Sequence, residues 1–278
     1  MIPVIDTEKV SSIIAEAAET LILPRFMQLK DGEVDTKTGP GDLVTIADRE
    51  TEAFLDRALP ALYPGTVLIG EESISEGKKS LDSLKDRDRL VWVTDPVDGT
   101  HNFVHGKKEF AVMLAAVYNG EIVYGWIYDA PNRTMMVAER GAGAWFGGER
   151  MRTAPPRPLN ELRGHIGWKY YPEKLRPYIA ERRGKVKEAF SLNCAGHEYL
   201  LIASGKADFG IYSRVKAWDH LAGVLAVREA GGVDCLWDGR PYYPAFQGHG
   251  LLAASCPETA AEIRAAILEG FTKILETG

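Results

Sequence analysis

Two aspartates, Asp95 and Asp98, follow an apolar segment and stand three positions apart, with Pro96 between them. The lead-in Trp92–Thr94 is β-prone and predicts a buried strand. Proline lacks the N–H group that a sheet ladder needs, so we expect the strand to end at Pro96. Two carboxylates this close repel each other unless a cation lies between them, and oxygen-only ligands suit Mg²⁺. An Asp-Pro turn followed by an Asp-Gly turn explains the same residues equally well.

Three further segments place an acidic residue at the end of a β element or the start of a helix. They are Glu71 after the strand-like Val67–Gly70, Asp219 before the helical run Leu221–Val227, and Asp48 between Leu43–Ala47 and a predicted helix over Arg49–Leu59. Adjacent glutamates in a strand point to opposite faces, so only one of Glu71 and Glu72 can share a site with Asp95. For Asp48 and Asp219 the alternative is helix capping. Together the four segments predict a two-metal site for phosphoryl transfer, in which carboxylates hold cations about 3.5–4 Å apart.

In their order and spacing these segments resemble the inositol monophosphatase family of Mg²⁺-dependent, Li⁺-sensitive phosphatases, whose wider superfamily includes fructose-1,6-bisphosphatases and 3′-phosphoadenosine-type nucleotidases. The matching stretches are Asp42-Leu43-Val44-Thr45 through Asp48, Gly70-Glu71-Glu72-Ser73, Asp95-Pro96-Val97-Asp98-Gly99-Thr100 with Asn102-Phe103-Val104-His105-Gly106, Trp218-Asp219 with Ala222-Gly223, and Gly231-Gly232. Lys37 falls at the position of the family's loop lysine.

The resemblance implies a set of metal ligands. Glu71, Asp95 and the backbone carbonyl of Val97 match the ligands of a first, activating Mg²⁺. Asp95, Asp98 and Asp219 match those of a second, with Asp95 bridging. Glu71 also matches a contact of a third, weaker ion, so the resemblance implies two or three Mg²⁺ per active site.

The resemblance also implies catalytic groups. Glu71, Asp48 and Thr100 match catalytic residues, of which Asp48 and Thr100 orient the attacking water. The backbone N–H groups of Gly99 and Thr100 would receive phosphate oxygens at the start of a helix, an arrangement that suits an anion.

Asp98, Gly99, Thr100, Ala195 and Tyr212 match positions that bind substrate, Ala195 through its backbone. One of these positions departs from the family. Seven residues before Asp219, inositol-type members carry a glutamate that contacts substrate hydroxyls, and here the residue is Tyr212. Tyrosine offers a neutral hydroxyl and a ring face, with Arg214 close by in sequence. This change disfavours a cationic substrate such as histidinol phosphate and favours a second anionic group or a flat ring. The alternative is that Tyr212 only packs at a strand end.

Composition limits the function classes. The chain has 278 residues and a net charge of −6, which argues against non-specific nucleic-acid binding. It contains no signal-peptide pattern and no apolar run of transmembrane length, so we expect no membrane partner and a cytoplasmic protein. The three cysteines lack CxxC spacing and are interpreted as reduced, packed thiols.

The element pattern changes along the chain. Phe110–Tyr118 and Glu121–Tyr128, joined by Asn119-Gly120, predict a hairpin within an antiparallel sheet. After the Pro-rich segment Thr153–Pro158, strands and helices alternate, which indicates α/β layering. We therefore expect an N-terminal α+β half, residues 1–153, carrying most of the metal ligands, and a C-terminal α/β half, residues 154–278, supplying Asp219. The fold implied by the resemblance is a layered αβαβα sandwich with the active site at the junction, and a homodimer.

These observations predict an enzyme that hydrolyses a small phosphate monoester with metal-activated water, similar to inositol-1-monophosphatase. Fructose-1,6-bisphosphatase, 3′(2′),5′-bisphosphate nucleotidase and histidinol-phosphatase activities are the alternatives on the same fold. A catalytically inactive regulator that binds a phosphorylated ligand is the alternative outside enzymes. The complete carboxylate set favours the enzyme, because an inactive relative has no need to keep a repulsive cluster.

Overall fold

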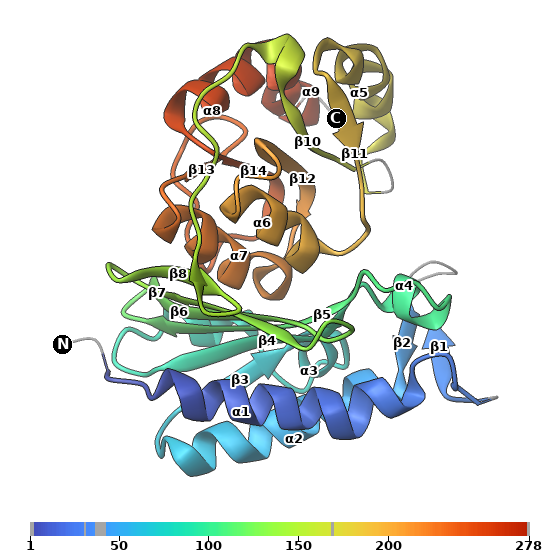
Figure 1. The fold of residues 1–278 in the computed structure, drawn as a ribbon, viewed down its shortest axis with the longest axis vertical. Helices are drawn as coiled ribbons and strands as arrows, with labels where there is room; N and C mark the ends of the chain where they lie inside the picture. Colours follow the sequence, from blue (N-terminus) through green and yellow to red (C-terminus); the bar gives the residue numbers. More distant parts are fainter. Residues whose placement is uncertain (1–2, 31, 37–42, 168–169, 277–278) are drawn as a thin grey trace.

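Helices and β-sheets alternate in layers through the computed structural model, which describes residues 3–276 except 31, 37–42 and 168–169 (Figure 1). Helices α1 and α2 cover the outer face of a first sheet, and α6 and α7 lie between this sheet and a second one. Helices α5, α8 and α9 lie beyond the second sheet. This order of layers confirms the αβαβα fold expected from the sequence.

The first layer is built from α1 (Thr7–Ala17) and α2 (Ile46–Leu62). Asp6 caps α1 by accepting the N–H of Lys9 at 3.1 Å, as its position in the sequence predicts. The helical path continues through a π-helical turn and a short 3-10 turn that ends at Arg25, next to the proline expected to stop it. Helix α2 begins at Ile46, earlier than predicted, after a small sheet of β1 (Val34–Thr36) and β2 (Leu43–Thr45).

The first sheet has seven strands in sequence order. They are β3 (Val67–Gly70), β4 (Val91–Asp98), β5 (Ala111–Tyr118), β6 (Glu121–Asp129), β7 (Thr134–Glu139), β8 (Gly143–Phe146) and β9 (Glu149–Arg150). Only β3 and β4 pair in parallel, and the remaining neighbours are antiparallel. The predicted hairpin is confirmed, with Asn119 and Gly120 both at positive φ, 52° and 75°, as a type I′ turn requires.

The expected end of a strand at Pro96 is wrong. Strand β4 continues to Asp98, but its register against β5 shifts: Asp95 faces Met113, whereas Asp98 faces Ala111. Three steps along β4 therefore match two along β5, which is a β-bulge. A bulge leaves one residue outside the ladder, so a proline without an N–H group is tolerated within the strand.

The second sheet has five strands in the order β11-β10-β12-β14-β13. They are β10 (Arg163–Ile166), β11 (Glu188–Phe190), β12 (Phe209–Val215), β13 (Val233–Leu236) and β14 (Gly248–Ala254). The helices around it are α5 (Arg176–Arg182), α6 (Ala195–Ala203), α7 (Ala217–Glu229), α8 (Pro257–Ile263) and α9 (Phe271–Glu276). The change of sheet falls between Arg150 and Arg163, and a boundary after residue 153 stays a prediction within that connection.

One apolar core joins the first sheet to α6 and α7. Strand β6 and helix α7 approach so closely that a Cβ at Gly125 would lie 3.0 Å from the Cα of Ala222. Helices α6 and α7 meet at Gly223, where a Cβ would lie 2.1 Å from the ring of Tyr199. This packing fixes the start of α7 relative to the end of β4. Within the described ranges, no helix combines the length and the apolar character needed to cross a bilayer.

Candidate active site

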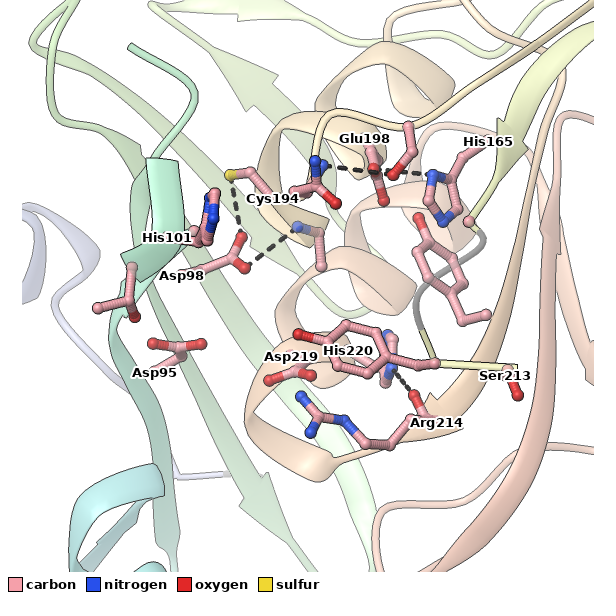
Figure 2. Close-up of a pocket in the computed structure, with 18 of the residues that line it drawn as sticks. Asp95, Asp98, His101, His165, Cys194, Glu198, Ser213, Arg214, Asp219 and His220 are labelled. Atoms are coloured by element: carbon pink, nitrogen blue, oxygen red, sulfur yellow. Dashed lines mark hydrogen bonds and ion pairs between the residues drawn. The ribbon is translucent and has the colours of Figure 1, made fainter. Parts of the chain in front are cut away.

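Four helices begin at one pocket of about 310 Å³, which is lined by residues from both sheets. Glu71 opens α3 (Glu71–Ser75), Thr100 opens α4 (Thr100–Val104), Ala195 opens α6, and Asp219 lies in the first turn of α7. The bulged end of β4 supplies Asp95 and Asp98 (Figure 2). Helix N-termini present unpaired N–H groups and a positive dipole end, so this convergence favours carboxylates and anionic ligands.

Three carboxylates form the acidic centre of the pocket. Glu71, Asp95 and Asp219 each offer an oxygen, and these oxygens lie within 4.8 Å of one another. Asp95 is only 3% exposed. Burial, followed by repulsion from Glu71, Asp98 and Asp219, raises the pKa of Asp95 well above its ordinary range. A set of hard oxygen ligands that repel one another fits a divalent cation such as Mg²⁺.

Asp219 reaches this centre from the C-terminal half of the chain. Because α7 begins at Ala217, the capping position belongs to Lys216, and Asp219 lies inside the first turn. Burial raises the pKa of Asp219 well above its ordinary range, repulsion from Glu71 adds to the rise, and Arg214 and Lys216 oppose it. Helix capping at the N-cap position therefore does not account for Asp219.

Asp98 ties the end of β4 to the start of α6. Its Oδ1 accepts the N–H of Ala195 at 3.1 Å, and its Oδ2 accepts the N–H of Gly196 at 2.6 Å and the thiol of Cys194 at 3.1 Å. Burial raises the pKa of Asp98 to about 6, and these three hydrogen bonds oppose the rise. Ala195 is expected to contact substrate through its backbone, and its N–H group is engaged by Asp98 in this structure.

Asp48 serves two purposes. Its Oδ2 accepts the backbone N–H of Thr45 at 2.8 Å, which forms a capping box at the start of α2. Its Oδ1 lies 3.3 Å from the hydroxyl of Thr100, the residue with which the resemblance pairs it. The same hydroxyl lies 2.9 Å from the carbonyl of Val97. Because a hydroxyl has one proton, Thr100 donates to one of these two oxygens at a time.

Gly99 lets β4 turn into α4 beside the carboxylates. It has φ +86°, and a Cβ there would lie 2.6 Å from the carbonyl oxygen of Glu109. Asn102 holds the turn, because its amide donates to the carbonyls of Glu109 and Leu192, both at 2.7 Å. The second of these bonds anchors the loop that leads into α6.

Glu52 positions the start of α3 beside the pocket, a role that the sequence did not indicate. Its buried carboxylate accepts the N–H groups of Glu72 and Ser73, both at 2.8 Å, at the start of α3. A Cβ at Gly70 would lie 2.2 Å from Glu52 Oε2, so glycine is required for this approach. The spacing of Glu52 one helical turn after Asp48 could have indicated a second acid on the same face of α2.

Tyr212 lines the pocket and packs against other rings. Its ring stacks with those of His165 and Tyr199, each with its centroid 5.0 Å away, and His220 approaches to 4.9 Å. The expectation that Tyr212 offers a ring face to substrate stays a prediction, and so does the alternative that it only packs at a strand end. The predicted loop lysine, Lys37, lies outside the described residues.

Comparisons with known proteins agree on one family. The profile of the inositol monophosphatase family matches residues 6–272. A fructose-1,6-bisphosphatase/inositol-1-monophosphatase of Thermotoga maritima is 34% identical over 72% of this chain and 73% of its own length. An inositol-1-monophosphatase of Bacillus subtilis is 31% identical over 80% of this chain and 82% of its own length. Among solved structures, an IMPase of Thermotoga maritima superposes with a TM-score of 0.83 at 26% identity, covering 96% of this chain and 98% of that one.

The layered fold and the acidic pocket, with these relatives, define the protein as a phosphatase. More specifically, the chain belongs to the inositol monophosphatase family, since the family profile spans nearly its whole length.

Proposed function

We propose that this enzyme hydrolyses a small phosphate monoester with Mg²⁺-activated water, as inositol-1-monophosphatase does. The observation that carries the proposal is the group of three carboxylates, Glu71, Asp95 and Asp219, with oxygens within 4.8 Å of one another at the convergence of four helix N-termini. Hydrolysis is in line, without a covalent intermediate.

The proposed ligands divide between two cation positions. Glu71, Asp95 and the carbonyl of Val97 would hold the first Mg²⁺, and Asp95, Asp98 and Asp219 the second, with a third ion weaker and near Glu71. Bound Mg²⁺ supplies charge neutralisation at the phosphoryl group and lowers the pKa of a water molecule. The raised pKa of the buried Asp95 supports this assignment, because a cation is what would favour its ionised form.

Other residues of the chain orient the reactants. Asp48 and Thr100 would position the attacking water, since a hydroxyl that donates to a carboxylate keeps its lone pairs for a water proton. The N–H groups of Gly99 and Thr100 would receive phosphate oxygens at the start of α4. Asp98, Ala195 and Tyr212 line the same pocket, which supports their proposed place around the leaving group.

We also propose three further properties of this enzyme. Li⁺ inhibits at millimolar levels by taking the place of the second Mg²⁺ near Asp98 and Asp219. The enzyme acts in the cytoplasm, and it forms a homodimer. Inhibition curves for LiCl against KCl and the mass of the protein in solution test the first and last of these.

The test is phosphate release as a function of Mg²⁺ concentration. The substrates are inositol 1-phosphate, fructose 1,6-bisphosphate, adenosine 3′,5′-bisphosphate and histidinol phosphate, with Asp95→Asn as the control variant. We expect Mg²⁺-dependent turnover of at least one phosphate monoester and a weak response to histidinol phosphate. Phosphate binding without turnover of any substrate would favour the non-enzymatic regulator instead.

A further inference from the structure

We propose that His197 and Asp129 act as a positioning pair, which fixes the start of α6 in the orientation that Asp98 needs to bind a cation. Asp98 already holds this helix, because its carboxylate accepts the N–H groups of Ala195 and Gly196. The inference rests on the proposed function, in which Asp98 would bind the second Mg²⁺ and Ala195 would contact substrate. It adds two residues that do not line the pocket to those that determine its geometry.

Strand register places two carboxylates in one row of the first sheet. Asp98 in β4 pairs with Ala111 in β5, and Ala111 pairs with Asp129 in β6. Residues that lie opposite each other on neighbouring strands point to the same face of a sheet. Asp98 and Asp129 therefore share a face, on strands that are two positions and about 10 Å apart.

The first turn of α6 lies directly on this row. A Cβ at Gly196 would lie 3.2 Å both from Asp98 Oδ2 and from the Cβ of Ala111. The next residue, His197, reaches the other end of the row, where its Nε2 lies 3.5 Å from Asp129 Oδ1. One helical turn thus contacts both carboxylates, the first through backbone N–H groups and the second through an imidazole.

His197 and Asp129 form a largely buried ion pair, with side chains 14% and 9% exposed. Nε2 of His197 makes no hydrogen bond of normal geometry within the described part of the chain, so the carboxylate is its counter-charge. Burial lowers the pKa of His197, but Asp129 raises it above its ordinary range overall, and Asp98 and Glu109 act in the same sense. Burial raises the pKa of Asp129, whereas His197 and Asn132 bring it below its ordinary range. Both shifts favour the charged forms of the two side chains.

The orientation of α6 matters because Asp98 has little acceptor capacity to spare. An ionised carboxylate offers about four acceptor positions. Three of them receive the N–H groups of Ala195 and Gly196 and the thiol of Cys194, which leaves one, on Oδ1, for a cation. The direction of that last position depends on how the first turn of α6 is held, and His197 holds the end of this turn that Asp98 does not reach.

The experiment measures the start of α6 in the metal-free protein and cation binding separately. Hydrogen exchange of peptides covering residues 193–200 reports the first, and calorimetric titration with Mg²⁺ reports the second. Turnover of inositol 1-phosphate gives kcat and KM. The variants are His197→Gln, which removes the charge, His197→Lys, which keeps a positive charge, and Asp129→Asn. Asn132→Ala is the matched control, because the amide of Asn132 also donates to Asp129, at 2.9 Å, but lies outside α6.

We expect His197→Gln and Asp129→Asn to speed exchange at the start of α6 about tenfold, while the strands of the first sheet exchange as in the wild type. The Mg²⁺ concentration for half-saturation and the KM should each rise about three- to tenfold, with a smaller change in kcat, as loss of one charge-assisted contact predicts. His197→Lys should keep most of the wild-type behaviour, and Asn132→Ala should match the wild type. In the double variant of His197→Gln with Asp129→Asn the losses should not add, because the two residues act as a unit.

Unchanged exchange at the start of α6 in His197→Gln would overturn the inference. Equal acceleration throughout the protein would also overturn it, because the pair would then contribute only to overall stability, and so would additive losses in the double variant. Absence of turnover of any phosphate monoester by the wild type would instead overturn the proposed function. Hydrogen exchange in the metal-free protein decides the inference in that case as well, since it needs no turnover.

Discussion

Glu52 offers a sharp test of how the fold positions a proposed metal ligand, Glu71. Its carboxylate is 5% exposed and accepts two backbone N–H groups at 2.8 Å, those of Glu72 and Ser73. Glu71 is the preceding residue and belongs to the acidic centre. A hydrogen bond to a charged group contributes about 1.5–3 kcal/mol. Glu52→Gln keeps one acceptor oxygen but turns an NH₂ toward the other N–H, so we expect the unfolding free energy to fall by about 2–3 kcal/mol.

The same substitution should loosen the start of α3 and with it Glu71. We therefore expect the Mg²⁺ concentration for half-maximal turnover to rise about tenfold, the equivalent of about 1.4 kcal/mol in cation binding. Urea denaturation and Mg²⁺ titration, by calorimetry and by turnover, measure the two effects separately. Glu50→Gln is the control on the same helix, since Glu50 pairs with Arg25 on the surface and should contribute about 0–1 kcal/mol. Unchanged stability and an unchanged Mg²⁺ curve in Glu52→Gln would refute the reasoning.

Three other substitutions test the remaining parts of the site. Asp95→Asn should lower turnover by about 10²–10³ or more. The metal-free protein should become more stable, because a repulsive buried carboxylate is removed. Near-full turnover with Mg²⁺ would contradict the two-metal proposal. Asp219→Ser should leave helix α7 intact, because Lys216 holds the N-cap position. The substitution should nevertheless reduce activity and raise the Mg²⁺ concentration that turnover requires. An unchanged dependence of turnover on Mg²⁺ would show that Asp219 is not a ligand. Burial lowers the pKa of His220 from 6.5 to about 4. The unfolded state therefore binds the proton of this imidazole more readily than the folded state does. The stability that neutral His220 contributes is present above pH 6.5 and is lost as the pH falls toward 4. Denaturation of wild type and His220→Gln between pH 4 and 7 checks this, and parallel pH profiles would count against it.

Local sequence patterns determined the acidic site to a large extent. Carboxylates at the ends of apolar runs indicated a cation site, and the structure brings Glu71, Asp95 and Asp219 together from three separate elements. The layered fold was implied by the order and spacing of the motifs, and the hairpin at Asn119-Gly120 followed from turn chemistry alone. The turn was predictable because it depends on adjacent residues, whereas the meeting of the three carboxylates and the layered fold were implied by the family resemblance.

Other features depend on which segments pack together, and a local pattern contains no such information. Pro96 stays within β4 because β5 accepts a bulge opposite it, and the pattern of one strand cannot show its partner's register. Asp98 is held by N–H groups of α6, and the ring of Tyr212 stacks with rings from β10 and α6.

The sequence could not decide whether Asp48 caps a helix or contacts Thr100, because both contacts are made, one by each carboxylate oxygen. Glu52 was missed for a related reason. Its role exists only where α2 lies against the start of α3, at a glycine that lets the two approach. Residue types along the chain thus determined which chemistry is available, whereas tertiary packing decided which oxygen, N–H group or ring face each side chain meets, because those contacts join residues distant in sequence.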